Sequence, residues 1–254
     1  MANRTIVVSK DAAVLAAAVG ARLLTRLVDA QAVRGNASVV LTGGGVGIAS
    51  LAAVRASAAR GAVDWRRVDV WWGDERFVPV DDDRRNEKQA RTALLDSLDL
   101  DPARVHPMPA TGGPDGDDAD AAAAHYADQL AEAAPPDGDV PAFDVLLLGM
   151  GPEGHVASIF PESPAAHDER TVFAVHGCPK PPPTRITMGF SALNAAREVW
   201  MIVAGEDKAP AVAMALGEAG RVQVPAAGVA GRSQTLWLLD EPAASRLPRG
   251  LRRL

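Results

Sequence analysis

Short apolar runs alternate with longer helix-like stretches along almost the whole chain. Several runs are apolar at every position, as in the Val-Leu-Leu-Leu of residues 145–148. A strand with two apolar faces needs a covering on both sides, as in a parallel sheet with helices on each face. The pattern therefore predicts an α/β fold with a doubly wound, mostly parallel sheet and helices on both faces, of the Rossmann-like kind.

The expected elements follow from the same pattern. Strands are predicted at residues 5–8, 38–41, 68–72, 143–148, 171–175, 185–188, 198–203 and 235–239. Helices are predicted at residues 12–33, 48–59, 87–97, 120–133 and 206–216. Loops rich in glycine, proline and aspartate flank the 120–133 helix, but neither side of them looks able to fold alone. We expect one α/β domain over residues 1–254.

Composition and charge restrict the partners. The net charge is −6 and no basic run occurs, which argues against a nucleic-acid surface. Polar residues at 9–11 interrupt the first apolar run, unlike a signal peptide, and no stretch approaches the roughly 18 apolar residues of a membrane span. The single cysteine, Cys178, fits a reducing compartment and is interpreted as incidental. We expect a cytoplasmic monomer or small homo-oligomer that binds neither nucleic acid nor membranes.

Three consecutive glycines, Gly43, Gly44 and Gly45, follow a predicted strand and precede a predicted helix. Glycines let a ligand approach the backbone, and a helix N-terminus adds N–H donors and a partial positive charge. The run has neither the spacing of a dinucleotide fingerprint nor the Gly-Lys-Ser/Thr of a P-loop. A phosphate-binding loop and a tight strand-to-helix turn both remain open.

A polar cluster follows the predicted strand at 68–72. It contains Asp74 and Arg76, and Asn86 begins the next helix. The guanidinium of Arg76 is suited to a phosphate or carboxylate, and a salt bridge to a neighbouring acid is the alternative. The three aspartates at 81–83 cannot all reach one ion, so they are interpreted as a solvated acidic turn and not as a metal site.

A glycine-rich turn after another buried strand presents His155 at the start of a predicted short helix. Gly151 is one of three glycines that clear space around this histidine, and Glu153 lies two residues before it. This segment is the strongest candidate for catalysis. Ser158 is not in a G-x-S-x-G elbow, and the five histidines lack the spacing of a zinc site, so a serine nucleophile and a metal are rejected.

Two further cations lie near strand ends. Arg185 opens a predicted strand, and Lys208 lies in the first turn of a predicted helix, where the helix dipole disfavours a cation. A solvated lysine is the alternative for Lys208. In a doubly wound sheet, ligands bind beyond the carboxyl ends of the strands. Because these motifs gather at strand ends, we expect them to share one site.

The motifs resemble those of 6-phosphogluconolactonases. Residues 72–79 with Asn86 resemble the signature W-G-D-E-R-x-V-P…N, and residues 148–161 resemble L-G-M-G-x-D-G-H-T-A-S-L-F-P. Residues 185–187 and 205–209 match two further blocks in the expected order. The resemblance implies the sugar-phosphate isomerase/deaminase type of fold. It also implies hydrolysis of 6-phospho-D-glucono-1,5-lactone to 6-phosphogluconate in the oxidative pentose phosphate pathway, with a small sugar phosphate as substrate and with no cofactor or metal.

Six positions, in four places along the chain, depart from the family pattern. Gly45, Val46 and Gly47 stand where the family has Ser-Thr-Pro, so only backbone donors remain there. Glu153 replaces an aspartate and is longer by one methylene. Val156 replaces a threonine, and Arg85 replaces the serine before Asn86.

The residues suggest a mechanism without a covalent nucleophile. Neutral His155 would deprotonate the attacking water, and Glu153 would orient the imidazole of His155. Backbone N–H groups of residues 149–154 or an arginine would stabilise the oxyanion. An amino-sugar-phosphate deaminase is the nearest alternative, but it needs a carboxylate where this chain has Phe160. A non-catalytic sugar-phosphate-binding protein is the other alternative. The expected substrate-binding residues are Gly43, Gly44, Gly45, Asp74, Arg76, Asn86, Gly151, Arg185 and Lys208.

Overall fold

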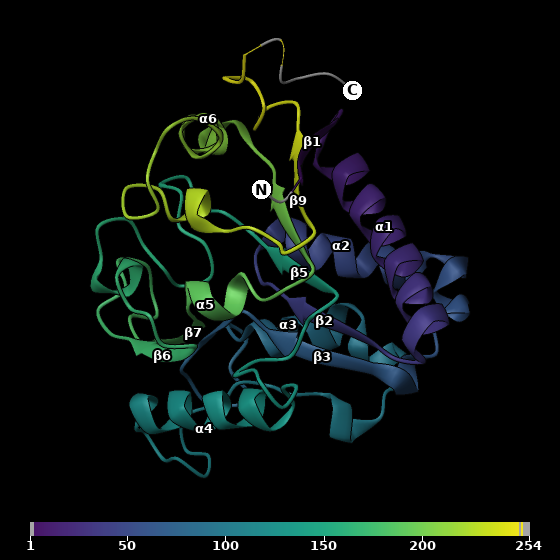
Figure 1. Cartoon of the computed structure of the whole chain (residues 1–254), viewed down its shortest axis with the longest axis vertical. Coiled ribbons are helices and arrows are strands. Elements are labelled where there is room, and N and C mark those ends of the chain that lie inside the picture. The colour runs from purple at the N-terminus through teal and green to yellow at the C-terminus, as the bar shows by residue number, and fades with distance from the viewer. Residues whose placement is uncertain (1–2, 249, 251–254) are drawn as a thin grey trace.

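The computed structural model describes residues 3–248 and 250, and its centre is a six-stranded sheet in which all neighbouring strands are parallel (Figure 1). The strand order is β1-β9-β8-β5-β2-β3. The strands are β1 (Asn3–Ser9), β2 (Ala37–Leu41), β3 (Val68–Trp72), β5 (Val145–Leu148), β8 (Glu198–Val203) and β9 (Gln234–Asp240). The predicted parallel α/β sheet is confirmed.

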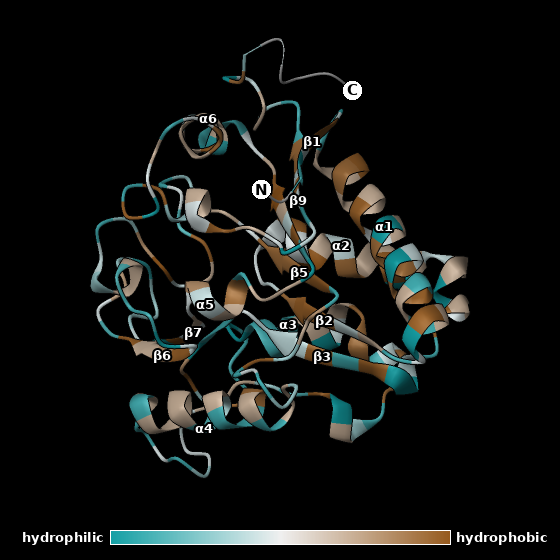
Figure 2. Cartoon of the chain, viewed as in Figure 1, coloured by the Kyte–Doolittle hydropathy of each residue, from teal (hydrophilic) through white to brown (hydrophobic). Residues whose placement is uncertain are grey.

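Helices cover both faces of this sheet, as predicted. Helices α1 (Ala12–Arg34), α2 (Gly45–Ala56) and α3 (Asn86–Ala93) pack on one face. Helices α4 (Ala119–Glu132), α5 (Phe190–Leu193) and α6 (Ala209–Leu216) pack on the other. Figure 2 shows the apolar strands between these layers. The side chains of Leu146 and Leu148 face one core and those of Val145 and Leu147 face the other, which explains why β5 is apolar throughout.

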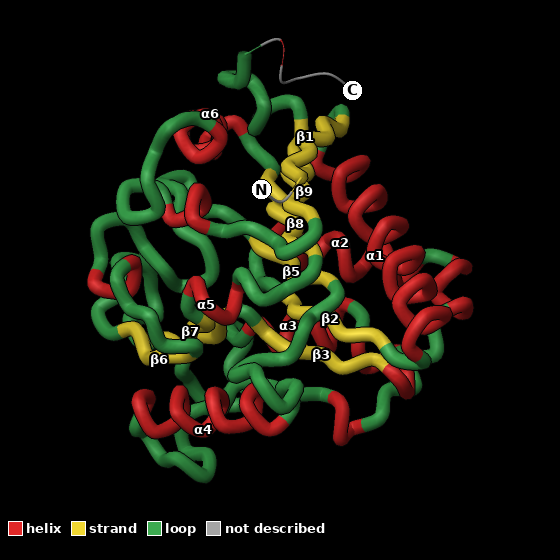
Figure 3. Tube along the Cα trace, viewed as in Figure 1, coloured by secondary structure: helices red, strands yellow, loops and turns green. Residues whose placement is uncertain are grey.

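A second, three-stranded antiparallel sheet lies beside the first, in the order β4-β7-β6 (Figure 3). Its strands are β4 (Asp74–Arg76), β7 (Arg185–Met188) and β6 (Val172–Val175). The strands β6 and β7 were predicted, whereas β4 was not among the predicted strands. The sequence did not reveal it because the three polar residues of β4 carry no apolar alternation and pair with β7 through the backbone.

Short 3₁₀ helices complete the fold and account for the shifted element boundaries. The predicted helix at 87–97 ends early and continues as a 3₁₀ turn, and the helix at 206–216 begins as one. They are η1 (Ala58–Ala62), η2 (Trp65–Arg67), η3 (Leu95–Ser97), η4 (Pro102–Arg104), η5 (Pro164–Ala166), η6 (Glu206–Lys208) and η7 (Pro225–Gly228). None of the helices described is both long and apolar enough to cross a membrane.

The strand order places a ligand crevice at the middle of the sheet. β2 pairs with β3 on one side and with β5 on the other, so the chain winds away in opposite directions from the β2–β5 pair. Loops that leave the carboxyl ends of such a pair diverge and leave a crevice between them. The glycine run at 43–45 follows β2 and the His155 segment follows β5, so both open onto this crevice.

Candidate active site

A cavity of about 590 Å³ lies at the carboxyl ends of β2, β5 and β8. Ten of the eleven residues expected at the site line it, and Glu153 lies behind His155. The ten are Gly43, Gly44, Gly45, Asp74, Arg76, Asn86, Gly151, His155, Arg185 and Lys208. The structure therefore brings together residues that are up to 165 positions apart in the chain, from Gly43 to Lys208.

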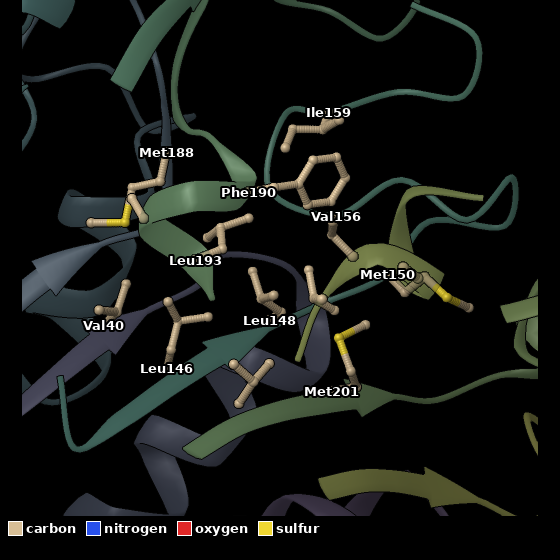
Figure 4. Close-up of a cluster of buried hydrophobic side chains, with 14 of the residues drawn as sticks. Val40, Leu146, Leu148, Met150, Val156, Ile159, Met188, Phe190, Leu193 and Met201 are labelled. Atoms are coloured by element: carbon tan, nitrogen blue, oxygen red, sulfur yellow. The ribbon is translucent and has the colours of Figure 1, made fainter. Parts of the chain in front are cut away.

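The segment that carries His155 is a series of tight turns and not the short helix that we expected. Gly154 has φ +92° and Ala157 has φ +48°, both in the left-handed region, which a right-handed helix excludes. The Gly151 N–H donates to the His155 carbonyl at 3.1 Å and closes the turn. Val156 and Ile159 are fully buried beside it (Figure 4). The hydrophobic core therefore fixes the turn on both sides of the histidine.

The imidazole of His155 is held at one nitrogen and is stacked on one face. Its Nδ1 lies 2.9 Å from Oε1 of Glu153, and Phe160 stacks on the ring with the centroids 4.5 Å apart. A Cβ on Gly151 would lie 2.1 Å from Nδ1, so only glycine leaves room for the ring. With Nδ1–H donating to the carboxylate, the lone pair of the neutral ring is at Nε2.

Burial lowers the pKa of His155 below its ordinary value of 6.5. The Glu153 carboxylate acts in the opposite direction, as expected for a neighbouring anion, and Lys180 adds to the lowering. Burial also opposes the charge of Glu153, but its hydrogen bond with Lys180 and the proximity of His155 leave the pKa of that carboxyl lowered overall. At neutral pH the pair therefore consists of a carboxylate and a neutral imidazole.

Lys180 was not predicted to be part of the site. Its Nζ lies 2.8 Å from Oε1 and 2.9 Å from Oε2 of Glu153, and the residue lines the cavity. The signal that could have found it is weak: a lysine followed by three prolines, five residues before the expected cation Arg185. The loop between β6 and β7 brings this lysine over the site.

Arg185 is 5 % exposed and holds this loop. Its Nε donates to the Pro182 carbonyl at 3.2 Å, and its Nη2 donates to the Lys180 carbonyl at 3.0 Å. Arg185 also lies directly opposite Arg76 in the antiparallel pairing of β7 with β4. Two like charges at opposite positions are unfavourable unless an anion lies between or beside them. The pair therefore suits an anionic ligand in the cavity.

Arg76 does not form the salt bridge that was the alternative to ligand binding. The ion partner of Glu75 in the described part of the chain is Arg85, with Nη2 and Oε2 3.8 Å apart. Arg76 donates from Nη1 to the Arg84 carbonyl, and its buried Nε has no hydrogen-bond partner among the residues described. A guanidinium with unused donors beside a cavity is suited to bind an oxyanion.

Glu75 fixes the start of α3 from beneath the site. It is 1 % exposed and accepts hydrogen bonds from the N–H groups of Asn86 at 2.7 Å and Glu87 at 2.8 Å. Burial raises the pKa of Glu75, although Arg85 and these N–H groups act to lower it. Arg85, the departure from the family serine, is 1 % exposed and supplies the compensating charge. Asn86 is therefore placed by a buried network.

Asp74, Asn86 and Ser158 form a second polar group at the cavity. Nδ2 of Asn86 donates to the Asp74 carbonyl at 2.8 Å, and the Ser158 hydroxyl donates to Oδ2 of Asp74 at 2.7 Å. Ser158 is fully buried in this bond, which agrees with the rejection of a serine nucleophile. Oδ1 of Asn86 is buried without a partner in the part of the chain described. It lies where a side chain on Gly43 would be, so Gly43 leaves room for the amide.

Lys208 and the glycine run line the same cavity. Gly44 has φ +84° and forms the N-cap of α2. Because no side chain caps this helix, its first-turn N–H groups can donate hydrogen bonds to a ligand. Lys208 is the N-cap residue of α6, near the place expected, and its ammonium contacts Asp207.

The predicted solvated acidic turn at 81–83 is exposed at Asp81 and Asp83 and partly buried at Asp82. Asp82 pairs with Arg84, and Asp83 pairs with Lys88 at 2.7 Å. Over residues 3–248 and 250, no group of three or more histidine, cysteine, aspartate or glutamate side chains is arranged to hold a metal ion.

Comparison with known proteins places this cavity in a family. Residues 10–237 match the family described as glucosamine-6-phosphate isomerases/6-phosphogluconolactonase. The chain is 60 % identical over 249 residues to 6-phosphogluconolactonase of Streptomyces coelicolor, covering 97 % of this chain and 95 % of the relative. It is 52 % identical over 247 residues to 6-phosphogluconolactonase of Mycobacterium tuberculosis, covering 97 % and 99 %.

A solved structure agrees with these relatives. The 6-phosphogluconolactonase of Trypanosoma brucei superposes with a TM-score of 0.84 at 29 % identity, covering 98 % of this chain and 100 % of that chain. The chain belongs to the family of glucosamine-6-phosphate isomerases and 6-phosphogluconolactonases, and its relatives place it on the 6-phosphogluconolactonase side of that family.

Proposed function

We propose that this protein hydrolyses 6-phospho-D-glucono-1,5-lactone to 6-phosphogluconate, with His155 as the general base that activates water. The observation that carries the proposal is a neutral, oriented imidazole in a cavity that is also lined by Arg76, Lys180, Arg185 and Lys208. The substrate is a dianionic phosphate ester and the product gains a carboxylate. A cavity with several cations and a neutral base matches both.

The reaction needs no covalent step. Nε2 of His155 takes a proton from water as the water oxygen bonds to the lactone carbonyl carbon, which gives a tetrahedral oxyanion. The protonated imidazole then returns the proton to the ring oxygen as the bond from that oxygen to the carbonyl carbon breaks. Glu153 stabilises the imidazolium between these two proton transfers.

We assign the stabilisation of the oxyanion to an arginine and not to the glycine N–H groups near His155. The Gly149 N–H donates to Thr42 at 3.3 Å, and the Gly154 N–H donates to the Gly151 carbonyl at 2.9 Å. The Gly151 N–H is used as well, in the turn described above. Arg76 keeps unused donors and lies on the same cavity, so it is the better candidate.

We also propose the setting in which the reaction takes place. The proposed enzyme is a cytoplasmic α/β domain that works without a metal or cofactor and acts in the oxidative pentose phosphate pathway. Its partner is the sugar phosphate, and we propose no contact with nucleic acid or membranes.

A deaminase of the same family is the main rival, and one assay pair separates the two. Phe160 is 3 % exposed and stacks on His155, so an apolar ring occupies the place where the deaminase needs a carboxylate. The phosphorylated lactone can be generated with a glucose-6-phosphate dehydrogenase and its disappearance compared with spontaneous hydrolysis. We expect acceleration of this hydrolysis and no ammonia from glucosamine 6-phosphate; the reverse pattern would support the deaminase.

The lactonase rate is expected to fall as the pH drops through an apparent pKa below 6.5. Burial lowers the pKa of His155, and only the neutral imidazole accepts a proton, so activity is lost when the pH passes below that pKa. The measurement is the enzymatic rate against pH after subtraction of spontaneous hydrolysis. An acid limb with its midpoint well above 6.5, or no acid limb at all, would contradict this assignment.

Truncation of a phosphate-binding cation should weaken only the phosphorylated substrate. A charge-assisted hydrogen bond contributes roughly 1.5–3 kcal/mol, so Lys208→Ala should weaken binding of the phosphorylated lactone by about ten- to a hundredfold. Arg76→Ala, which removes the proposed oxyanion donor, should instead lower the turnover of both lactones. The test compares each variant with wild type on the phosphorylated lactone and on gluconolactone.

Lys88→Ala is the matched control, because Lys88 forms an ion pair with Asp83 and does not line the cavity. Equal losses on both lactones would assign the cation to the chemistry or the fold. No loss for either variant would leave the N-terminus of α2, at Gly43, Gly44 and Gly45, as the phosphate site.

A further inference from the structure

The ammonium of Lys180 and the imidazole of His155 hold one carboxylate from two sides. Oε1 of Glu153 lies 2.8 Å from Nζ of Lys180 and 2.9 Å from Nδ1 of His155. Oε2 of Glu153 lies 2.9 Å from the same Nζ. Both carboxylate oxygens therefore contact the lysine ammonium, and Oε1 also accepts a hydrogen bond from Nδ1 of His155.

The loop that carries Lys180 is itself anchored. Buried Arg185 binds the carbonyl groups of Lys180 and Pro182, and the Cys178 N–H donates to the Pro183 carbonyl at 2.8 Å. Three consecutive prolines at 181–183 further restrict the backbone. The backbone at Lys180 is thus fixed even though its side chain is partly exposed.

A glutamate needs such a partner more than an aspartate does. The additional methylene of Glu153, relative to the aspartate of the resembling family pattern, adds a rotatable bond between the backbone and the carboxylate. A longer side chain loses more conformational freedom when it is fixed in one orientation. A second contact on the carboxylate reduces the number of orientations available to it.

We propose that Lys180 is a positioning residue: its ammonium group fixes the Glu153 carboxylate, and this carboxylate fixes the imidazole of His155 for catalysis. The inference rests on the proposed function of His155. It assigns Lys180 to the catalytic pair and not to the phosphate, although Lys180 is one of the cations that line the cavity.

The kinetic test is Lys180→Met beside Lys180→Arg. A misplaced base costs about a hundredfold for a displacement of about 1 Å, so we expect kcat of Lys180→Met to fall by about ten- to a hundredfold. KM should change little, the loss should be equal on phosphorylated and unphosphorylated lactones, and Lys180→Arg should restore most of it. A rise in KM confined to the phosphorylated lactone would assign Lys180 to the phosphate and overturn the proposal.

A double-mutant comparison tests whether the effect passes through Glu153. In the Glu153→Gln background the ammonium no longer has a carboxylate to fix. Adding Lys180→Met to that background should therefore lower kcat by less than about a further twofold. The full single-mutant loss in that background would show that Lys180 acts by another route.

The last readout does not depend on turnover. Charged groups on three elements act on His155: Glu153 and Asp74 raise its pKa, and Lys180 lowers it. Removal of the ammonium should therefore move the NMR titration of the His155 imidazole to higher pH in Lys180→Met, while Lys88→Met leaves it unchanged. An unchanged titration in Lys180→Met would refute the contact. If the titration shifts in Lys180→Met but the wild type has no lactonase activity, only the proposed function is refuted.

Discussion

Replacement of His155 by alanine is expected to lower the turnover number for the phosphorylated lactone by about 10²–10⁴, the usual contribution of a positioned general base. The backbone of the turn is held by buried Val156 and Ile159, so the fold should persist. The loss of the stacking contact with Phe160 should cost roughly 0.5–1.5 kcal/mol of stability. Steady-state kinetics and thermal unfolding of the purified variant measure the two effects.

His125→Ala is the matched control for this variant. The His125 ring also lies against a carboxylate, with Nδ1 3.1 Å from Asp115, but it does not line the cavity. It should keep wild-type turnover. A folded His155→Ala protein with near-wild-type activity would remove His155 from the mechanism.

Gly151→Ala is expected to reduce turnover by about a hundredfold or more without direct removal of any reacting group. The new Cβ would lie 2.1 Å from Nδ1 of His155 and 2.7 Å from Oε2 of Glu153, so the ring and the carboxylate must both move. A displacement of about 1 Å is enough for a loss of that size. The measurement is kcat of the variant, together with a crystal structure that locates the imidazole.

Gly61→Ala is the control for adding a methyl group. Nothing lies within 4 Å of a Cβ at Gly61, and its φ is not in the left-handed region. It should be neutral in activity and close to neutral in stability. If Gly151→Ala retained full activity, the space beside His155 would be unimportant and the proposed orientation of the ring would be wrong.

The parallel sheet could be predicted because the sequence of a single strand shows that both of its faces are buried. β5 is apolar at all four positions, and the two cores on either side of it explain why. The predicted gathering of Gly43, Asp74, His155 and Lys208 followed from the rule that parallel strands end at one edge. Both inferences use information that is local in sequence together with a general property of α/β folds.

The errors came from contacts between distant parts of the chain. Asp74, Glu75 and Arg76 form a strand only because β7, more than 100 residues later, offers its backbone, as in the pairing of Arg76 with Arg185. The segment around His155 looked helical because helix propensity is local, while the turn depends on left-handed φ values and on core packing. Lys180 could not be placed because its role depends on a loop held by a buried arginine.

The central claim is that His155 activates water for lactone hydrolysis in this cavity. Its most direct test is the rate of disappearance of 6-phospho-D-glucono-1,5-lactone at neutral pH, in the presence of a metal chelator, with wild type, with His155→Ala and with buffer alone. We predict strong acceleration by wild type, undiminished by the chelator, and a rate with His155→Ala that is about 10²–10⁴ lower. Equal rates for wild type and His155→Ala, or for wild type and buffer, would contradict the claim.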